Sequence, residues 1–175
     1  LTQTISKQVD GIGKLVDEFS SFARMPKAEI KLDNLSKTLK ESFNLFVNSH
    51  PKINMKLLSK TKDIYFQFDR FQITQAFNNI IKNSVEAVNN IPNPSITVDL
   101  LENNNQIEFI VKDNGVGIDE NKISKYFEPY FTTKDKGTGL GLSIVKKIIE
   151  DHSGIIKIEK NKNMAGTTTV IIFNI

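Results

Sequence analysis

The sequence predicts an α/β fold: a two-layer sandwich in which one mixed sheet carries helices on one face. Segments with apolar residues three and four apart, typical of helices, are interspersed with short segments of alternating apolar and polar residues, typical of strands. The strand-like segments mostly come as neighbours joined by short turns, which favours antiparallel hairpins. A length of 175 residues accommodates one such domain with a short additional segment.

The composition excludes several classes of protein. A net charge of +3, with no basic run interleaved with aromatic residues, argues against a nucleic-acid partner. The absence of cysteine excludes disulfides and thiolate chemistry, and the two histidines have no metal-ligand spacing. No apolar run approaches the roughly 20 residues of a membrane span. We therefore expect no membrane contact by this chain, and the start at Leu1 favours a piece of a longer protein.

The first 25 residues are predicted to form one helix with an apolar seam. Its apolar residues alternate four and three apart, which is the heptad pattern of a helical bundle: Ile5, Val9, Ile12, Val16 and Phe19. Pro26 ends this helix. The predicted organisation is a helix over 1–25, a linker over 26–29 and a domain over 30–175.

The first half of the domain is expected to mix short strands with two helices. Strands are predicted at 29–32, 53–58 and 64–68. Asn34 is expected to cap a helix that ends near Val47, with Leu45 or Phe46 facing inward. Asp69 is expected to cap a longer helix over 71–90.

The second half is expected to hold two hairpins and two helices. The hairpins pair 96–101 with 107–111 and 155–159 with 168–173. Between them lie a short helix over 121–127, a loop, and a helix with Leu142, Val145, Ile148 and Ile149 on its buried face, which Gly154 closes.

Three glycines precede this last helix. Gly137, Gly139 and Gly141 alternate with small or apolar residues just before a helix N-terminus, where unpaired N–H groups attract anions such as phosphate. A flexible loop is the alternative, because a glycine pattern alone is weak.

Two asparagines lie four residues apart on the helix over 71–90. Asn79 and Asn83 therefore share one face. An amide oxygen there suits Mg²⁺, which needs only one or two protein oxygens beside phosphate. The alternative is a solvated polar edge in an asparagine-rich chain.

A carboxylate follows the strand over 107–111. Asp113 stands before Gly115 and Gly117 in a segment longer than a turn requires. Its oxygens suit an exocyclic amine such as that of adenine, and the glycines allow close approach of a flat ring. Further on, Lys134 is a candidate phosphate partner. Phe131 is a candidate for holding a mobile loop in place, and the alternative is that it is a core residue.

In order, these segments resemble the N, G1, F and G2 boxes of the ATP-binding catalytic domain of sensor histidine kinases, particularly the NtrY-like nitrogen-regulation branch. That domain belongs to the gyrase–Hsp90–kinase–MutL superfamily. Any one box is weak, but four in order over residues 69–154 are specific. The resemblance implies the Bergerat sandwich, Mg²⁺–ATP as ligand and a lid over about 119–138.

The resemblance also assigns roles to residues. Asn83 would coordinate Mg²⁺, Asn79 would face the phosphates, and Asp113 would bind adenine. Asn79, Asn83 and Lys134 would act in catalysis. The implied nucleotide-binding residues further include Gly115, Gly117, Ile118, Phe131, Thr133, Lys134, Gly137, Thr138, Gly139, Leu140, Gly141 and Leu142.

The segment 16–26 resembles the end of the dimerisation hairpin of these kinases. It implies a homodimer, an acceptor histidine on a preceding helix, and relay to the aspartate of a response-regulator receiver domain. Neither His50 nor His152 lies in an acceptor motif. The chain is therefore expected to bind ATP without phosphorylating itself, as a cytoplasmic part of a protein held in the plasma membrane.

Three alternatives remain open at this level. One is an ATPase of the same superfamily that drives conformational change. Hydrolysis in those proteins resembles general-base catalysis by a glutamate, where this chain has Asn79, and an amide accepts no proton from water at neutral pH. The others are an anti-sigma type serine kinase and a non-enzymatic interaction module with an empty pocket.

Overall fold

The structure is a computed structural model that describes residues 25–58, 63–103, 105–134, 137–162 and 164–175, together with Gly13 and Ser20. The helix expected over residues 1–25 falls outside these residues, apart from Gly13, Ser20 and Met25. Among the described residues, no helix is both long and apolar enough to cross a membrane.

The elements expected within the domain are present. In chain order they are β1 (Lys31–Asn34), α2 (Leu35–Ser49), β2 (Asn54–Leu57), β3 (Tyr65–Phe68), α3 (Arg70–Ala87), β4 (Ser95–Asn103), β5 (Gln106–Asp113), the 3-10 helix η1 (Glu120–Phe127), α4 (Gly141–Asp151), β6 (Gly154–Lys160) and β7 (Thr167–Asn174). The largest shift from expectation is the end of α3, at Ala87 instead of Asn90.

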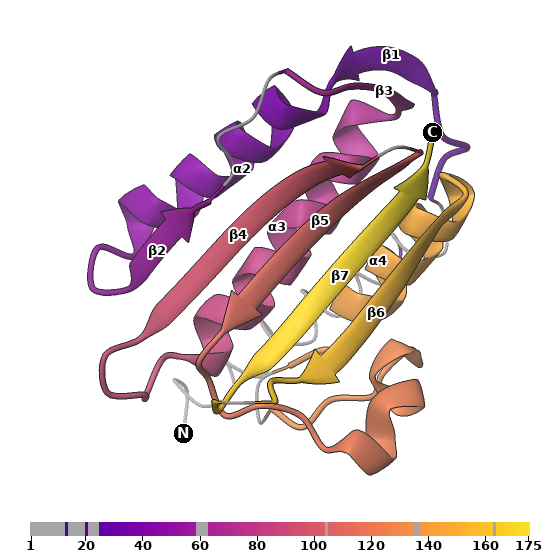
Figure 1. Ribbon diagram of the computed structural model, residues 1–175. Coiled ribbons are helices and arrows are strands. Elements are labelled where there is room, and N and C mark those ends of the chain that lie inside the picture. Colours follow the sequence, from indigo (N-terminus) through magenta and orange to yellow (C-terminus); the bar gives the residue numbers. More distant parts are fainter. Residues whose placement is uncertain are drawn as a thin grey trace.

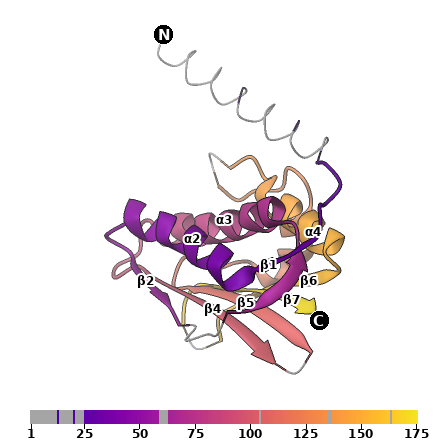
Figure 2. The same ribbon diagram turned by 90° about the horizontal axis from the view of Figure 1, so that it is seen from above.

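The fold is the expected two-layer α/β sandwich. The main sheet has five strands in the order β2-β4-β5-β7-β6, with β2 parallel to β4 and the other pairs antiparallel. The helices cover one face of it (Figures 1 and 2). The prediction of a single sheet was wrong in one respect, because in the described part of the chain β1 and β3 pair only with each other, in a separate two-stranded ribbon. That ribbon lies where α2 and α3 begin, since each of its strands leads directly into a helix.

The core lies between the sheet and the helices. Phe77 of α3 packs on Phe109 of β5, with ring centroids 4.3 Å apart. The predicted caps are confirmed: the side chains of Asn34 and Asp69 accept from backbone N–H groups in the first turns of α2 and α3. Of the two residues proposed to face inward in α2, Phe46 packs on the core and Leu45 is exposed.

Helices α3 and α4 pack against each other, and a hydrogen bond joins the start of α3 to the end of α4. The N–H of Asp69 at the start of α3 donates to Nε2 of His152, 3.0 Å away, at the end of α4. Nδ1 of His152 therefore carries the proton and donates to the carbonyl of Ile148 at 2.7 Å. Because the helices run antiparallel, the later turns of α3 lie beside the first turn of α4.

The end of α4 differs from the prediction. Ser153, with φ of 57°, takes the left-handed conformation expected of Gly154. Gly154 instead opens β6, where a Cβ atom would lie 2.9 Å from both the Ile149 side chain and the carbonyl oxygen of Ile172. A close approach between helix and strand, not helix termination, therefore requires this glycine.

The segment before β1 is bonded to the start of α3. The side-chain amide of Gln72 donates to the carbonyl of Pro26 at 2.9 Å, and the N–H of Glu29 donates to Asp69 at 2.8 Å. Met25 packs against the core. The residues of the expected linker are thus fixed to the helix that carries Asn79 and Asn83.

Candidate functional site

The sequence-predicted site residues lie around the end of β5, the C-terminal half of α3 and the start of α4. The β6–β7 hairpin closes the same end of the sheet, at the bottom of Figure 1.

Asp113 is a buried carboxylate that accepts three hydrogen bonds, with only 4% of its surface exposed. Its Oδ1 accepts from the N–H groups of Gly115 at 2.9 Å and Thr167 at 3.2 Å. Its Oδ2 accepts from the hydroxyl of Ser84 on α3 at 3.1 Å. A carboxylate offers about four acceptor positions, so the donors of the described residues leave about one position, on Oδ2, open. Asp113 can therefore accept one further donor, such as an exocyclic amine.

Burial raises the pKa of the Asp113 carboxyl above its usual 3.8, although the hydrogen bonds from Gly115, Thr167 and Ser84 oppose this shift. The folded protein therefore keeps this proton to a higher pH than the unfolded chain does. The contribution to the free energy of unfolding is largest below about pH 4 and falls as the pH rises through the raised pKa.

This shift gives a pH-dependent prediction. Urea unfolding of the wild type and of Asp113→Asn should be compared from about pH 4 to about pH 8. The stability of the wild type relative to the variant should fall as the pH rises, because only the wild type buries a charge at high pH. Comparison with the variant cancels the titration of the other groups. A difference that is constant or rises with pH would contradict the prediction.

The β6–β7 hairpin holds Asp113, which the sequence did not reveal. The side-chain amide of Asn161 donates to the carbonyl of Asp113 at 2.7 Å and to that of Ala165 at 3.0 Å. Its Oδ1 accepts from the hydroxyl of Thr168 at 2.6 Å. Gly166 has φ of 107°, and a Cβ atom there would lie 2.0 Å from the Asp113 carbonyl oxygen. Glycine before the last strand was the only available signal, and it does not identify Asp113 as the neighbour.

The two glycines after Asp113 have different neighbours. A Cβ atom on Gly115 would lie 2.6 Å from the carbonyl oxygen of Ala87, so Gly115 packs on the end of α3. Gly117 has φ of 75°, and a Cβ atom added there would lie 3.5 Å from its nearest neighbour, the carbonyl oxygen of Gly166. An added Cβ would therefore clash at Gly115 but make only ordinary contacts at Gly117, which half-buried Ile118 follows.

The start of α4 lies beside the two asparagines of α3. A Cβ atom on Gly141 would lie 3.5 Å from Asn79 Oδ1 and 4.0 Å from Asn83 Nδ2. The amide nitrogen of Asn79 donates to the carbonyl of Gln75 at 3.0 Å. The structure thus brings together the asparagine pair and a helix N-terminus, whose first N–H groups have no partner within the helix.

Lys134 reaches this group of residues from the loop before α4. Its ammonium donates to Asn83 Oδ1 at 3.2 Å and pairs with Glu86, one turn further along α3. Glu86 is not among the residues predicted from the sequence. Both charged side chains are 40% exposed, so the pair contributes only about 0.2–1 kcal/mol to stability.

The other predicted residues of the loop and of the start of α4 have four kinds of surroundings. Phe131 packs edge-on against Tyr126 at 5.3 Å. Gly139, with φ of 71°, accepts from the N–H of Tyr130 at 3.1 Å, and Gly137 donates to the carbonyl of Lys134. Leu140 is fully buried in the core, so only its backbone can face a ligand. The remaining predicted residues are exposed or half-buried: Thr133, Thr138 and Leu142.

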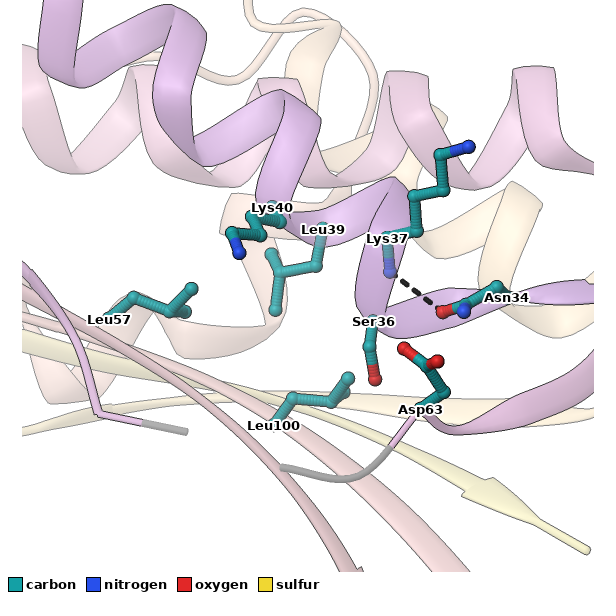
Figure 3. A pocket seen from close by; sticks show the side chains of 8 residues that line it. All are labelled: Asn34, Ser36, Lys37, Leu39, Lys40, Leu57, Asp63 and Leu100. Atoms are coloured by element: carbon teal, nitrogen blue, oxygen red, sulfur yellow. Dashed lines mark hydrogen bonds between the residues drawn. The ribbon is translucent and has the colours of Figure 1, made fainter. Parts of the chain in front are cut away.

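A separate hollow of about 360 Å³ lies between α2 and the β2 edge of the sheet. Figure 3 shows its lining side chains, among them Lys37, Lys40 and Leu100. Leu100 pairs with Phe109, four residues before Asp113 on β5. None of the predicted site residues lines this hollow.

Comparison with known proteins assigns the family. The sequence model of one protein family, the histidine kinase-, DNA gyrase B-, and HSP90-like ATPases, matches residues 68–175 of this chain. This chain belongs to that family. The match covers both helices of the site and the hairpin that holds Asp113.

Relatives and solved structures narrow the family to histidine kinases. The nitrogen regulation protein NtrY of Azorhizobium caulinodans is 38% identical over 162 residues, or 90% of this chain and 21% of that protein. An NtrY-like sensor histidine kinase of Rickettsia conorii is 35% identical over 98% of this chain and 28% of its own length. The chain thus spans about a quarter of these relatives.

Solved histidine kinase structures share the fold. The catalytic domain of histidine kinase ThkA is 32% identical with a TM-score of 0.75, over 83% of this chain and 95% of that one. ThkA in complex with the response regulator TrrA gives a TM-score of 0.81 at 26% identity, over 98% of this chain and 49% of that one. The predicted sensor-kinase family and its α/β sandwich are confirmed.

Proposed function

We propose that this chain binds Mg²⁺–ATP and supplies the γ-phosphoryl group to a histidine of the same protein outside the chain. The observation that carries the proposal is the free acceptor position on buried Asp113, on the same helix-bounded site as Asn83 and the first turn of α4. A nucleotide fits this arrangement, with its base at Asp113 and its phosphates at the first turn of α4.

Each group has a distinct task in this proposal. Asp113 accepts from the amine of adenine, while Gly117 leaves room for the ring. The first turn of α4 presents N–H groups and its positive dipole end to the phosphates. Asn83 Oδ1 fits a cation, because it accepts from the Lys134 ammonium. Bound Mg²⁺ would neutralise phosphate charge there, and positioning is most of what phosphoryl transfer requires.

Asn79 favours transfer over hydrolysis. Its amide cannot take a proton from water, and its nitrogen donates to the carbonyl of Gln75. Neither histidine of this chain lies in an acceptor motif, and His152 is also buried with both ring nitrogens bonded. The acceptor therefore lies elsewhere in the protein.

The proposed organisation is the one that the sequence resemblance implies. Residues 1–25 form the second helix of a dimerisation hairpin, 26–29 a linker, and 30–175 the catalytic domain, in a homodimer. The partner is a response-regulator receiver domain, as TrrA is for ThkA.

The test uses a version of the protein extended to include the preceding segment, incubated with Mg²⁺ and γ-labelled ATP. Acid-labile, alkali-stable label on the protein, lost when the acceptor histidine is replaced, is the expected result. Steady release of phosphate without labelled protein would refute the kinase proposal and favour an ATPase. Absence of nucleotide binding would favour an interaction module.

A further inference from the structure

Glu86 and Asn83 present two oxygens to the same cation. The ammonium of Lys134 lies 3.2 Å from Asn83 Oδ1 and within hydrogen-bond distance of Glu86 Oε2. The two oxygens belong to residues three apart on α3, so they share one face of the helix. The position between them thus accepts a positive charge.

The two oxygens have the chemistry that a hard divalent cation prefers. Mg²⁺ binds carboxylate and amide oxygens, and it commonly uses one or two protein oxygens with waters and phosphate oxygens completing the shell. Lys134 is a single flexible side chain on the loop, and its pair with Glu86 is half-exposed. An ion with a higher charge can therefore displace the ammonium.

We propose that Asn83 and Glu86 form a two-oxygen cation site, which the Lys134 ammonium and Mg²⁺ occupy alternately. Glu86 binds Mg²⁺ directly or through one of its waters. When Mg²⁺ enters with the nucleotide, Lys134 leaves Glu86 and becomes available to the phosphates. This inference rests on the proposed binding of Mg²⁺–ATP and adds a second, acidic residue to the metal site.

The test of Glu86 measures binding, not activity. ADP is titrated calorimetrically into the protein with Mg²⁺ and, separately, with EDTA. In Glu86→Gln, the tightening of ADP binding by Mg²⁺ should shrink about tenfold, while the affinity in EDTA stays within about twofold. Glu150→Gln is the matched control, because Glu150 is also an exposed helical glutamate paired with a lysine, Lys146. It should behave as the wild type.

The competition with Lys134 is tested with Mn²⁺ as the probe. The electron paramagnetic resonance signal of free Mn²⁺ reports metal binding at saturating ADP. Lys134→Met should bind Mn²⁺ several-fold more tightly than the wild type, because the competing ammonium is gone.

Each result is decisive. An unchanged effect of Mg²⁺ in Glu86→Gln would remove Glu86 from the metal site, and unchanged or weaker Mn²⁺ binding in Lys134→Met would refute the competition. If the wild type itself binds no ADP, or binds it equally with Mg²⁺ and EDTA, the result contradicts the proposed function and not only the role of Glu86.

Discussion

Replacing Asp113 by asparagine is expected to weaken ATP binding roughly 10- to 100-fold, since a hydrogen bond to a charged group contributes about 1.5–3 kcal/mol. The fold should survive, because the amide oxygen can still accept from the N–H groups of Gly115 and Thr167. The amide nitrogen then replaces Oδ2, and the hydroxyl of Ser84 can rotate to accept from it. That nitrogen is a donor, so it opposes the donor amine of adenine.

Asparagine tests this role more cleanly than alanine. Asp113→Ala would also weaken binding, but it leaves the donors of Gly115, Thr167 and Ser84 unpaired in a buried place, which destabilises the protein as well. Titration of ATP and GTP into the wild type and Asp113→Asn separates the two effects. The preference for ATP should shrink in the variant, and equal affinities for ATP in both proteins would contradict the adenine assignment.

Replacing Gly166 by alanine is expected to reduce the free energy of unfolding by about 2–5 kcal/mol. Overpacking typically costs about 1–3 kcal/mol, and the left-handed region costs an L-residue about 1–2 kcal/mol. Gly166 combines both penalties, with φ of 107° and an added Cβ atom 2.0 Å from the carbonyl oxygen of Asp113. Because the clash is with backbone, no side chain can relieve it.

Gly117→Ala is the matched control. Gly117 also has positive φ, at 75°, but the nearest atom to an added Cβ lies 3.5 Å away. The decrease in the free energy of unfolding of Gly117→Ala should therefore be limited to the conformational penalty of about 1–2 kcal/mol. Urea unfolding of the two variants measures the difference. Equal losses in both would show that the hairpin moves away from Asp113 at little cost.

The sequence alone determined the elements and part of the site. Periodicity predicted the helices and strands, because each pattern reflects which side chains of one segment face the core. Local chemistry predicted the caps Asn34 and Asp69, which bond to N–H groups three residues away. Asn79 and Asn83 share a face for the same local reason, the pitch of the helix.

Only the tertiary structure decided which strands pair and what surrounds each site residue. β1 and β3 form their own ribbon, although their patterns resemble those of the main sheet. Thr167 bonds to Asp113 across 54 residues, and Lys134 bonds to Glu86 across 48. No periodicity links residues so far apart. Such contacts form only where packing of the apolar faces brings the segments together, so no local pattern in the sequence predicts them.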